Sequence, residues 1–169
     1  MIRPSQTNRP DGFATVDLLI VVVIILIVVS YAWTAMIQLK SWQARSGAAQ
    51  QFAHYLEMAR SDSMRRRATE GPQMAQVTIL NDSYYEVRLD ANGDGVLDAP
   101  RVVSLAEQQL MINGPFPRTF MFDSTGKAVD ASRNALGATA VTFGNRSGKS
   151  AVTVSDTGKA TFVELSAKK

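Results

Sequence analysis

The stretch Gly12-Phe13-Ala14-Thr15-Val16-Asp17 leads directly into twelve uninterrupted apolar residues, Leu18 to Val29. No later part of the chain carries a comparable apolar run. An unpaired carboxylate costs on the order of 2.5–3.5 kcal/mol at the centre of a bilayer, and less near its edge. Asp17 stands at the mouth of this membrane-grade segment, so we predict that it is a functional residue with a charged partner.

The apolar run predicts a membrane anchor. Twelve residues are too few to cross about 30 Å of hydrocarbon, but Phe13 to Leu39 is long enough, with only mild polar interruptions. In lipid the backbone must satisfy its own hydrogen bonds, which forces this segment into a helix. The leader carries Arg3 and Arg9. By the positive-inside tendency the leader stays in the cytoplasm, and the residues after Leu39 lie outside it.

A cleaved secretory signal is the alternative for the same segment. Ser30-Tyr31-Ala32 has small residues at the two positions that a signal peptidase reads, and the apolar length also suits. Cleavage there would leave a chain that begins at Trp33. The acid at the start of the apolar run and the long, proline-containing leader argue against this alternative.

The order of residues in this stretch resembles the class III signal of type IV pilins and pseudopilins: glycine and phenylalanine, three further residues, an acid, and a run of Leu, Ile and Val. The resemblance implies cleavage between Gly12 and Phe13 by a prepilin peptidase, with methylation of the new Phe13 amine. The family's acid is usually Glu, whereas Asp17 is shorter by one methylene. The resemblance further implies that Asp17 pairs with the N-terminal amine of a neighbouring subunit, which would cancel most of the desolvation cost of both charges.

The remaining pattern divides the chain into four predicted segments. Residues 1–12 form a cytoplasmic leader that is removed, and residues 13–39 form the transmembrane and polymerisation helix. Residues 40–70 continue that helix in amphipathic form, until Gly71-Pro72 ends it, and residues 71–169 form a β-rich domain outside the cytoplasm. The predicted apolar stripe of the second helical half recurs at three- and four-residue spacing: Ala49, Phe52, Ala53, Leu56, Ala59 and Met64.

Short alternating runs after residue 73 predict antiparallel strands. Asp123-Ser124-Thr125-Gly126 and Asp156-Thr157-Gly158 are two similar turns, each followed by Lys-Ala. Residues 106–117 are expected to be irregular. We therefore predict an α+β fold, in which one long N-terminal helix packs on antiparallel sheets. The strands are expected at residues 75–79, 85–89, 101–105, 118–122, 140–143, 151–154 and 159–165.

The C-terminal part of the chain is similar to H-type pseudopilins of type II secretion and to FimT-type minor pilins. It shares with them a phenylalanine-containing strand, the Asp-Ser-Thr-Gly-Lys turn, Val152-Thr153-Val154 and the Asp-Thr-Gly-Lys turn. The resemblance implies a structural subunit whose partners are other pilin or pseudopilin subunits, the prepilin peptidase, an inner-membrane assembly platform and, before assembly, membrane lipid. The machine could be a type II secretion pseudopilus, a type IV pilus or a competence system.

One loop has the sequence of a calcium loop at its first nine positions. Acids or amides at alternate positions can converge on one hard cation, and a glycine allows the sharp turn. The residue at position twelve is Arg101 rather than a bidentate Glu, and the flanking segments are predicted strands. An Asx-rich loop that needs no metal is the alternative. No cofactor is required by this prediction, but calcium could bind at Asp90, Asn92, Asp94, Val96 and Asp98.

A second binding hypothesis concerns DNA. Arg146, Lys149 and Lys159 form a basic group that could bind phosphates, because some of the minor pilins that this chain resembles take part in DNA uptake. Aromatic residues are not interleaved, so any binding would be electrostatic and sensitive to salt. The net charge of +3 permits an acidic partner without requiring one.

Enzymatic chemistry is not expected. The chain has no cysteine, which excludes disulfides, thiol catalysis and cysteine-ligated metals. Its single histidine, His54, stands on a predicted helix without a second base or nucleophile at motif spacing. The sequence therefore favours a structural subunit. A DNA-binding subunit and a secreted or anchored β-domain with an unknown ligand are the alternatives.

Overall fold

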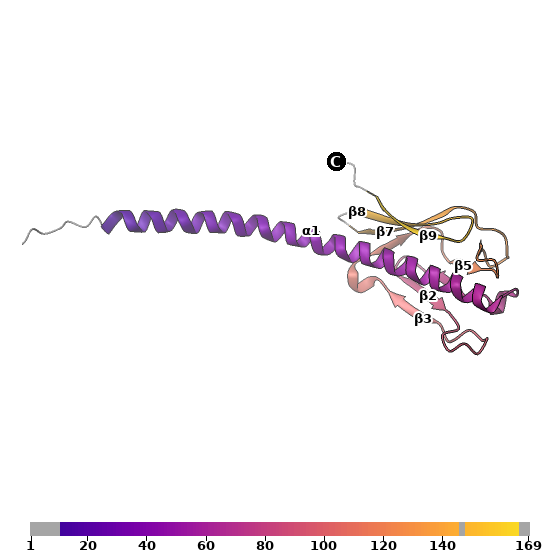
Figure 1. Cartoon of the computed structure of the whole chain (residues 1–169). Coiled ribbons are helices and arrows are strands. Elements are labelled where there is room, and N and C mark those ends of the chain that lie inside the picture. The colour runs from indigo at the N-terminus through magenta and orange to yellow at the C-terminus, as the bar shows by residue number, and fades with distance from the viewer. Residues whose placement is uncertain (1–10, 146–147, 166–169) are drawn as a thin grey trace, which may run out of the picture. The chain divides into compact units, whose positions relative to one another are not determined.

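The computed structural model describes residues 11–145 and 148–165, with side chains from residue 16 onward (Figure 1). The chain divides into two compact units, and the division falls between Lys40 and Ser41. Helix α1 (Asp11–Arg66) has 56 residues in total, and parts of it belong to each unit. Each unit is described separately below.

In the first unit, α1 presents apolar side chains on every side. Each of the twelve residues from Leu18 to Val29 is between 45% and 69% exposed. By length and composition this helix could cross a membrane, although a signal sequence would satisfy the same criteria. The hydroxyl groups of Ser30 and Thr34 donate to carbonyl oxygens of the preceding turn, so the helix itself satisfies them.

In the second unit, α1 buries one face. Ala49, Phe52, Leu56 and Ala59 are fully buried, as the predicted stripe requires. Met64 is 43% exposed, so its assignment to the core stripe was wrong. Its sulfur lies beside Gly126 in the Asp123–Gly126 turn.

Helix α1 ends at Arg66, four residues before the predicted end at residue 70. Arg67 adopts a left-handed conformation with φ 53°, and its N–H donates to the Met64 carbonyl at 3.2 Å. The N–H of Ala68 donates to the Ser63 carbonyl at 3.0 Å. This arrangement caps the last carbonyl groups of the helix. A short 3₁₀ turn, η1 (Gly71–Gln73), then leads into the strands.

The first sheet has five strands in the order β3-β2-β1-β5-β6, all antiparallel (Figure 1). Four of its strands follow the predicted runs closely. The fifth, β6, has two residues and was not predicted. The strands are β1 (Gln76–Ile79), β2 (Tyr84–Arg88), β3 (Arg101–Ser104), β5 (Arg118–Phe122) and β6 (Ala128–Val129).

The second sheet has four antiparallel strands in the order β4-β7-β8-β9. The segment expected to be irregular holds the 3₁₀ turn η2 (Ala106–Gln108) and β4. That expectation was wrong because a three-residue strand leaves little periodic pattern. The strands are β4 (Met111–Asn113), β7 (Thr139–Asn145), β8 (Gly148–Val154) and β9 (Ala160–Leu165).

Both sheets pack on the same stretch of helix. The Phe52 ring lies 5.2 Å from the ring of Tyr85 and 6.2 Å from that of Phe120, which belong to the first sheet. It also lies 5.3 Å from the ring of Phe143, which belongs to the second sheet. One buried apolar cluster therefore joins α1 to both sheets, and the predicted α+β fold is confirmed.

Strand directions can be read from contacts with the helix. The first residue of β9, Ala160, donates its N–H to Glu57, and Glu164 near the other end accepts a hydrogen bond from the Trp42 indole. Strand β9 therefore runs opposite to α1. In the first sheet, β2 leads to Asp90, whose N–H donates to Asp62 near the end of α1. Strand β3, antiparallel to β2, also runs opposite to the helix.

The outer edges of the other two border strands are partly covered. The N–H of Ile112 in β4 donates to the Asp82 carbonyl at 2.7 Å. The Ala128 carbonyl in β6 accepts from the N–H of Leu136 at 3.0 Å. Within the described residues, β3 and β9 form no such bonds along their outer edges.

The two similar turns lie against each other. Each turn ends in a glycine with φ +80°. These glycines are Gly126 in the β5–β6 turn and Gly158 in the β8–β9 turn. A Cβ added to Gly158 would lie only 2.0 Å from the Gly126 carbonyl oxygen. The turns therefore bring the two sheets together at a point where only glycine fits.

Candidate functional site

Asp17 lies on the exposed surface of α1 and is the second residue whose side chain is described. No described residue forms an ion pair or hydrogen bond with it. A carboxylate at the start of an exposed apolar helix needs an opposite charge from outside this chain when the helix enters lipid or packs against other helices. The role of Asp17 in assembly stays a prediction.

The predicted processing site falls at the start of α1. Gly12 and Phe13 belong to the helical backbone, but their side chains lie outside the described part of the chain, as do residues 1–10. Cleavage between them and methylation of Phe13 stay predictions.

The predicted calcium loop connects β2 to β3, where Asp90 is 3% exposed. Oδ1 of Asp90 accepts from the N–H groups of Gly93 at 2.6 Å and Asp94 at 3.1 Å, and Oδ2 accepts from Gly95 at 2.9 Å. Burial alone would raise the pKa of Asp90, but these bonds and the nearby Arg66 outweigh it and hold the pKa below its ordinary value. Asp90 is thus an ionised carboxylate whose oxygens already serve the loop's backbone.

The other proposed ligands are engaged separately. Asp94 accepts from the Val96 N–H at 2.8 Å and from the Asn92 amide at 2.9 Å. Asp98 accepts from the N–H of Ala91 at 2.8 Å. Among the described residues, no group of three His, Cys, Asp or Glu side chains is placed to hold a metal ion. Calcium binding stays a prediction, and the loop is arranged as an Asx-rich turn.

The structure describes two of the three residues in the predicted basic group. Arg146 lies outside the described residues. Lys149 is at the beginning of β8, whereas Lys159 immediately precedes β9, in the turn at the far end of β8. The extended chain from Lys149 to the end of β8 at Val154 spans roughly 17 Å. DNA binding through this group stays a prediction.

A polar cluster that the sequence did not reveal lies near the beginning of the second unit. Arg45 is only 5% exposed, and its Nε donates to the Ser150 hydroxyl at 3.1 Å. Its Nη1 donates to the Asn145 side-chain oxygen at 3.2 Å, while the Asn145 amide donates to the Ser41 carbonyl at 3.1 Å. The sequence carries no sign of this cluster, because only the strand register brings residues of β7 and β8 to Arg45.

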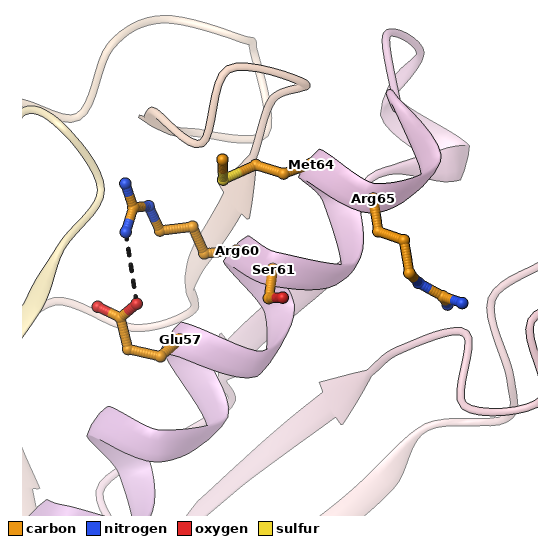
Figure 2. A pocket seen from close by; sticks show the side chains of 5 residues that line it. All are labelled: Glu57, Arg60, Ser61, Met64 and Arg65. Carbon is orange, nitrogen blue, oxygen red and sulfur yellow. Dashed lines mark hydrogen bonds and ion pairs between the residues drawn. The ribbon is translucent and has the colours of Figure 1, made fainter.

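A surface hollow of about 470 Å³ is lined by residues of α1: Glu57, Arg60, Ser61, Met64 and Arg65. Figure 2 shows these five side chains. Arg60 and Glu57 point toward each other, 3.5 Å apart, and Arg65 points away from them. The Nε of Arg60 donates to the Gly126 carbonyl, and Glu57 accepts from the first N–H of β9. These charged groups fasten both turns to the helix.

The chain therefore combines an exposed apolar helix with a pilin-like packing of helix on antiparallel sheets. A comparison with protein-family models, curated proteins and solved structures finds no match for this chain. The likeness to pilins therefore rests on the architecture of the chain and on the residues around Asp17.

Proposed function

We propose that this chain is a minor pilin or pseudopilin, a structural subunit that assembles through its N-terminal helix into a type IV pilus or a type II secretion pseudopilus. The observation that carries the proposal is the continuous exposure of Leu18 to Val29 on a helix that also packs on two antiparallel sheets. So many exposed apolar side chains require a cover, since water would penalise them strongly. Lipid provides it before assembly, and neighbouring helices provide it afterwards.

The N-terminal residues supply the chemistry of assembly in this proposal. A prepilin peptidase cleaves between Gly12 and Phe13, and the new Phe13 amine is methylated. Asp17 then pairs with the N-terminal ammonium of a neighbouring subunit. The pairing fixes the register of the helices, because an unpaired charge in an apolar bundle is costly.

Before assembly the subunit is a single-pass protein of the inner membrane in this proposal. Its N-terminus is cytoplasmic, as Arg3 and Arg9 favour, and its β-rich domain is periplasmic. Its partners are the other subunits and the assembly platform. The subunit is not an enzyme and needs no cofactor.

The intact mass of the mature chain tests the proposal. A mass that begins at methylated Phe13 supports it, whereas a mass that begins at Trp33 identifies a cleaved secretory signal and contradicts it. The variant Gly12→Val is the control, because a bulky residue at the cleavage position should leave the leader attached. An unprocessed wild-type chain in cells that contain a prepilin peptidase would favour a plain anchored β-domain.

DNA binding by the same subunit is the alternative from another class. No described basic surface supports it, since Lys149 and Lys159 are separated along β8. A gel shift at low salt would revive this alternative if Lys149→Ala abolished the shift.

A further inference from the structure

The loop that resembles a calcium site lies against the end of α1. Its first residue, Asp90, donates its backbone N–H to Oδ2 of Asp62 at 3.3 Å. The side chains of Asp62 and Asp90 are 9% and 0% exposed, respectively. Two buried acids therefore meet at this point. Buried carboxylates are stable only when hydrogen bonds and opposite charges compensate for the lost water.

Arg66 supplies the opposite charge. Its Nη2 lies 2.6 Å from Oδ2 of Asp62, and its Nε lies 3.6 Å from Oδ2 of Asp90. Its Nη1 donates to the Gly95 carbonyl oxygen at 3.5 Å. The side chain is 10% exposed. The guanidinium thus contacts two carboxylates and one loop carbonyl, which are the oxygen types that surround a hard cation in a metal loop.

Arg65 contributes from the outer side. Its Nη2 donates to Oδ1 of Asp62 at 3.0 Å and to the Asp90 carbonyl at 3.2 Å. Its side chain is 58% exposed, and it lies 4.0 Å from the Asp90 carboxylate. Solvent screens this contact far more than the contact of Arg66. Arg66 is therefore the principal positive charge at the loop.

We propose that the guanidinium of Arg66 is the resident cation of the Asp90–Asp98 loop and that the loop folds without calcium. The loop keeps the alternating acids and the glycine turn of a calcium loop. The carboxylate of its first residue, Asp90, faces Arg66 on the helix, and the remaining acids bond to nearby loop groups. A calcium ion at Asp90 would have to displace three backbone donors and face a guanidinium of the same charge sign.

Thermal unfolding of the full chain in detergent tests this proposal. Wild type should unfold at the same temperature in a calcium chelator, in millimolar calcium chloride and in magnesium chloride of equal ionic strength. Arg66→Gln should lower the unfolding temperature by on the order of 5 °C or more, since it leaves two buried acids uncompensated. Arg66→Lys keeps the charge but not the forked geometry of the guanidinium. Its unfolding temperature should lie between those of wild type and Arg66→Gln.

Arg67→Gln is the matched control, because it removes the neighbouring charge at the same helix end and no described residue forms an ion pair with Arg67. It should change the unfolding temperature by less than a third of the Arg66→Gln effect. The proposal is overturned if calcium, and not magnesium, raises the unfolding temperature of wild type. It is also overturned if Arg66→Gln lowers the unfolding temperature no more than Arg67→Gln does.

Discussion

Asp17 is the residue on which assembly depends in our proposal, and it has no part in the folded outer domain. Asp17→Ala should leave the thermal unfolding of that domain unchanged and should strongly reduce incorporation into filaments, since the neighbouring ammonium would then be buried without a partner. Asp17→Glu should assemble as well as wild type. Filament yield by sedimentation and immunoblotting measures the effect. Normal assembly of Asp17→Ala would remove the register role, while the processing site at Gly12 could still stand.

Asp123 gives the outer domain a contribution to stability that depends on pH. Burial alone would raise its pKa, but hydrogen bonds from Thr125 and Lys127 and the charge of Lys127 lower it below the ordinary value. The ionised turn is therefore most stabilising above about pH 5, and its contribution is lost as the pH falls through the lowered pKa of the folded state. Asp123→Ser should be less stable than wild type at pH 7, and the difference should shrink as the pH falls through the lowered pKa of Asp123.

The other turn provides a reciprocal control. Ser155 occupies the position of Asp123 there, and its hydroxyl accepts from the Lys159 N–H at 3.1 Å. Ser155→Asp should introduce a similar dependence of stability on pH. Urea unfolding at three pH values measures both variants. A constant difference between wild type and Asp123→Ser across that range would contradict the prediction.

At the scale of elements, the contact between the two turns is the tightest backbone approach around a glycine in the described chain. Gly158→Ala would introduce a Cβ 2.0 Å from the Gly126 oxygen at a φ of +80°. The left-handed conformation alone costs about 1–2 kcal/mol for a residue with a Cβ, and the clash must add to that cost. Gly137→Ala is the control, because Gly137 has φ +63° with nothing within 4 Å. Equal losses of unfolding free energy in the two variants would show that the close contact carries no cost.

The elements that could be predicted are those with a strong local pattern. The apolar run and the stripe through Phe52 and Leu56 determine α1, and alternation determines β1, β2 and β5. Strands β4 and β6 were missed because three and two residues show no period. Strand β4 exists because of a distant partner, as Ile112 pairs with Phe143 across thirty residues of chain. The similarity of the two turns was visible in the sequence, but their contact was not.

The candidate sites show the same limit. Asp17 was found because a carboxylate beside an apolar run can be recognised from the sequence alone. The role of Arg66 was not found, since it stands 24 residues before Asp90 in the sequence and only the fold brings them together. In the sequence Arg65, Arg66 and Arg67 are equivalent, since a positive charge near the C-terminus of a helix is favourable at any of these positions. Burial distinguishes Arg66 from Arg65 and Arg67, and burial depends on the whole fold.

At the scale of the whole molecule, Phe52 decides whether the two sheets and the helix unfold together. Its ring is fully buried and touches aromatic rings from both sheets. Phe52→Ala should lower the unfolding free energy by about 3–5 kcal/mol and should make the two sheets unfold less cooperatively. His54→Ala, on the exposed side of the same turn, should change it by less than about 0.5 kcal/mol. Urea unfolding followed by circular dichroism measures both, and a small loss for Phe52→Ala would mean that the sheets do not share one core.

The directions of β3 and β9 bear on how copies of this chain avoid sticking to one another in the wrong way. Exposed strand edges are templates for aggregation, and β9 is six residues long with exposed Val163 and Leu165. Both open edges run opposite to α1. Copies whose helices are parallel, as in one membrane, can therefore offer each other only edges that run the same way. Antiparallel pairing between the open edges of two copies would therefore require their α1 segments beside the sheets to run in opposite directions.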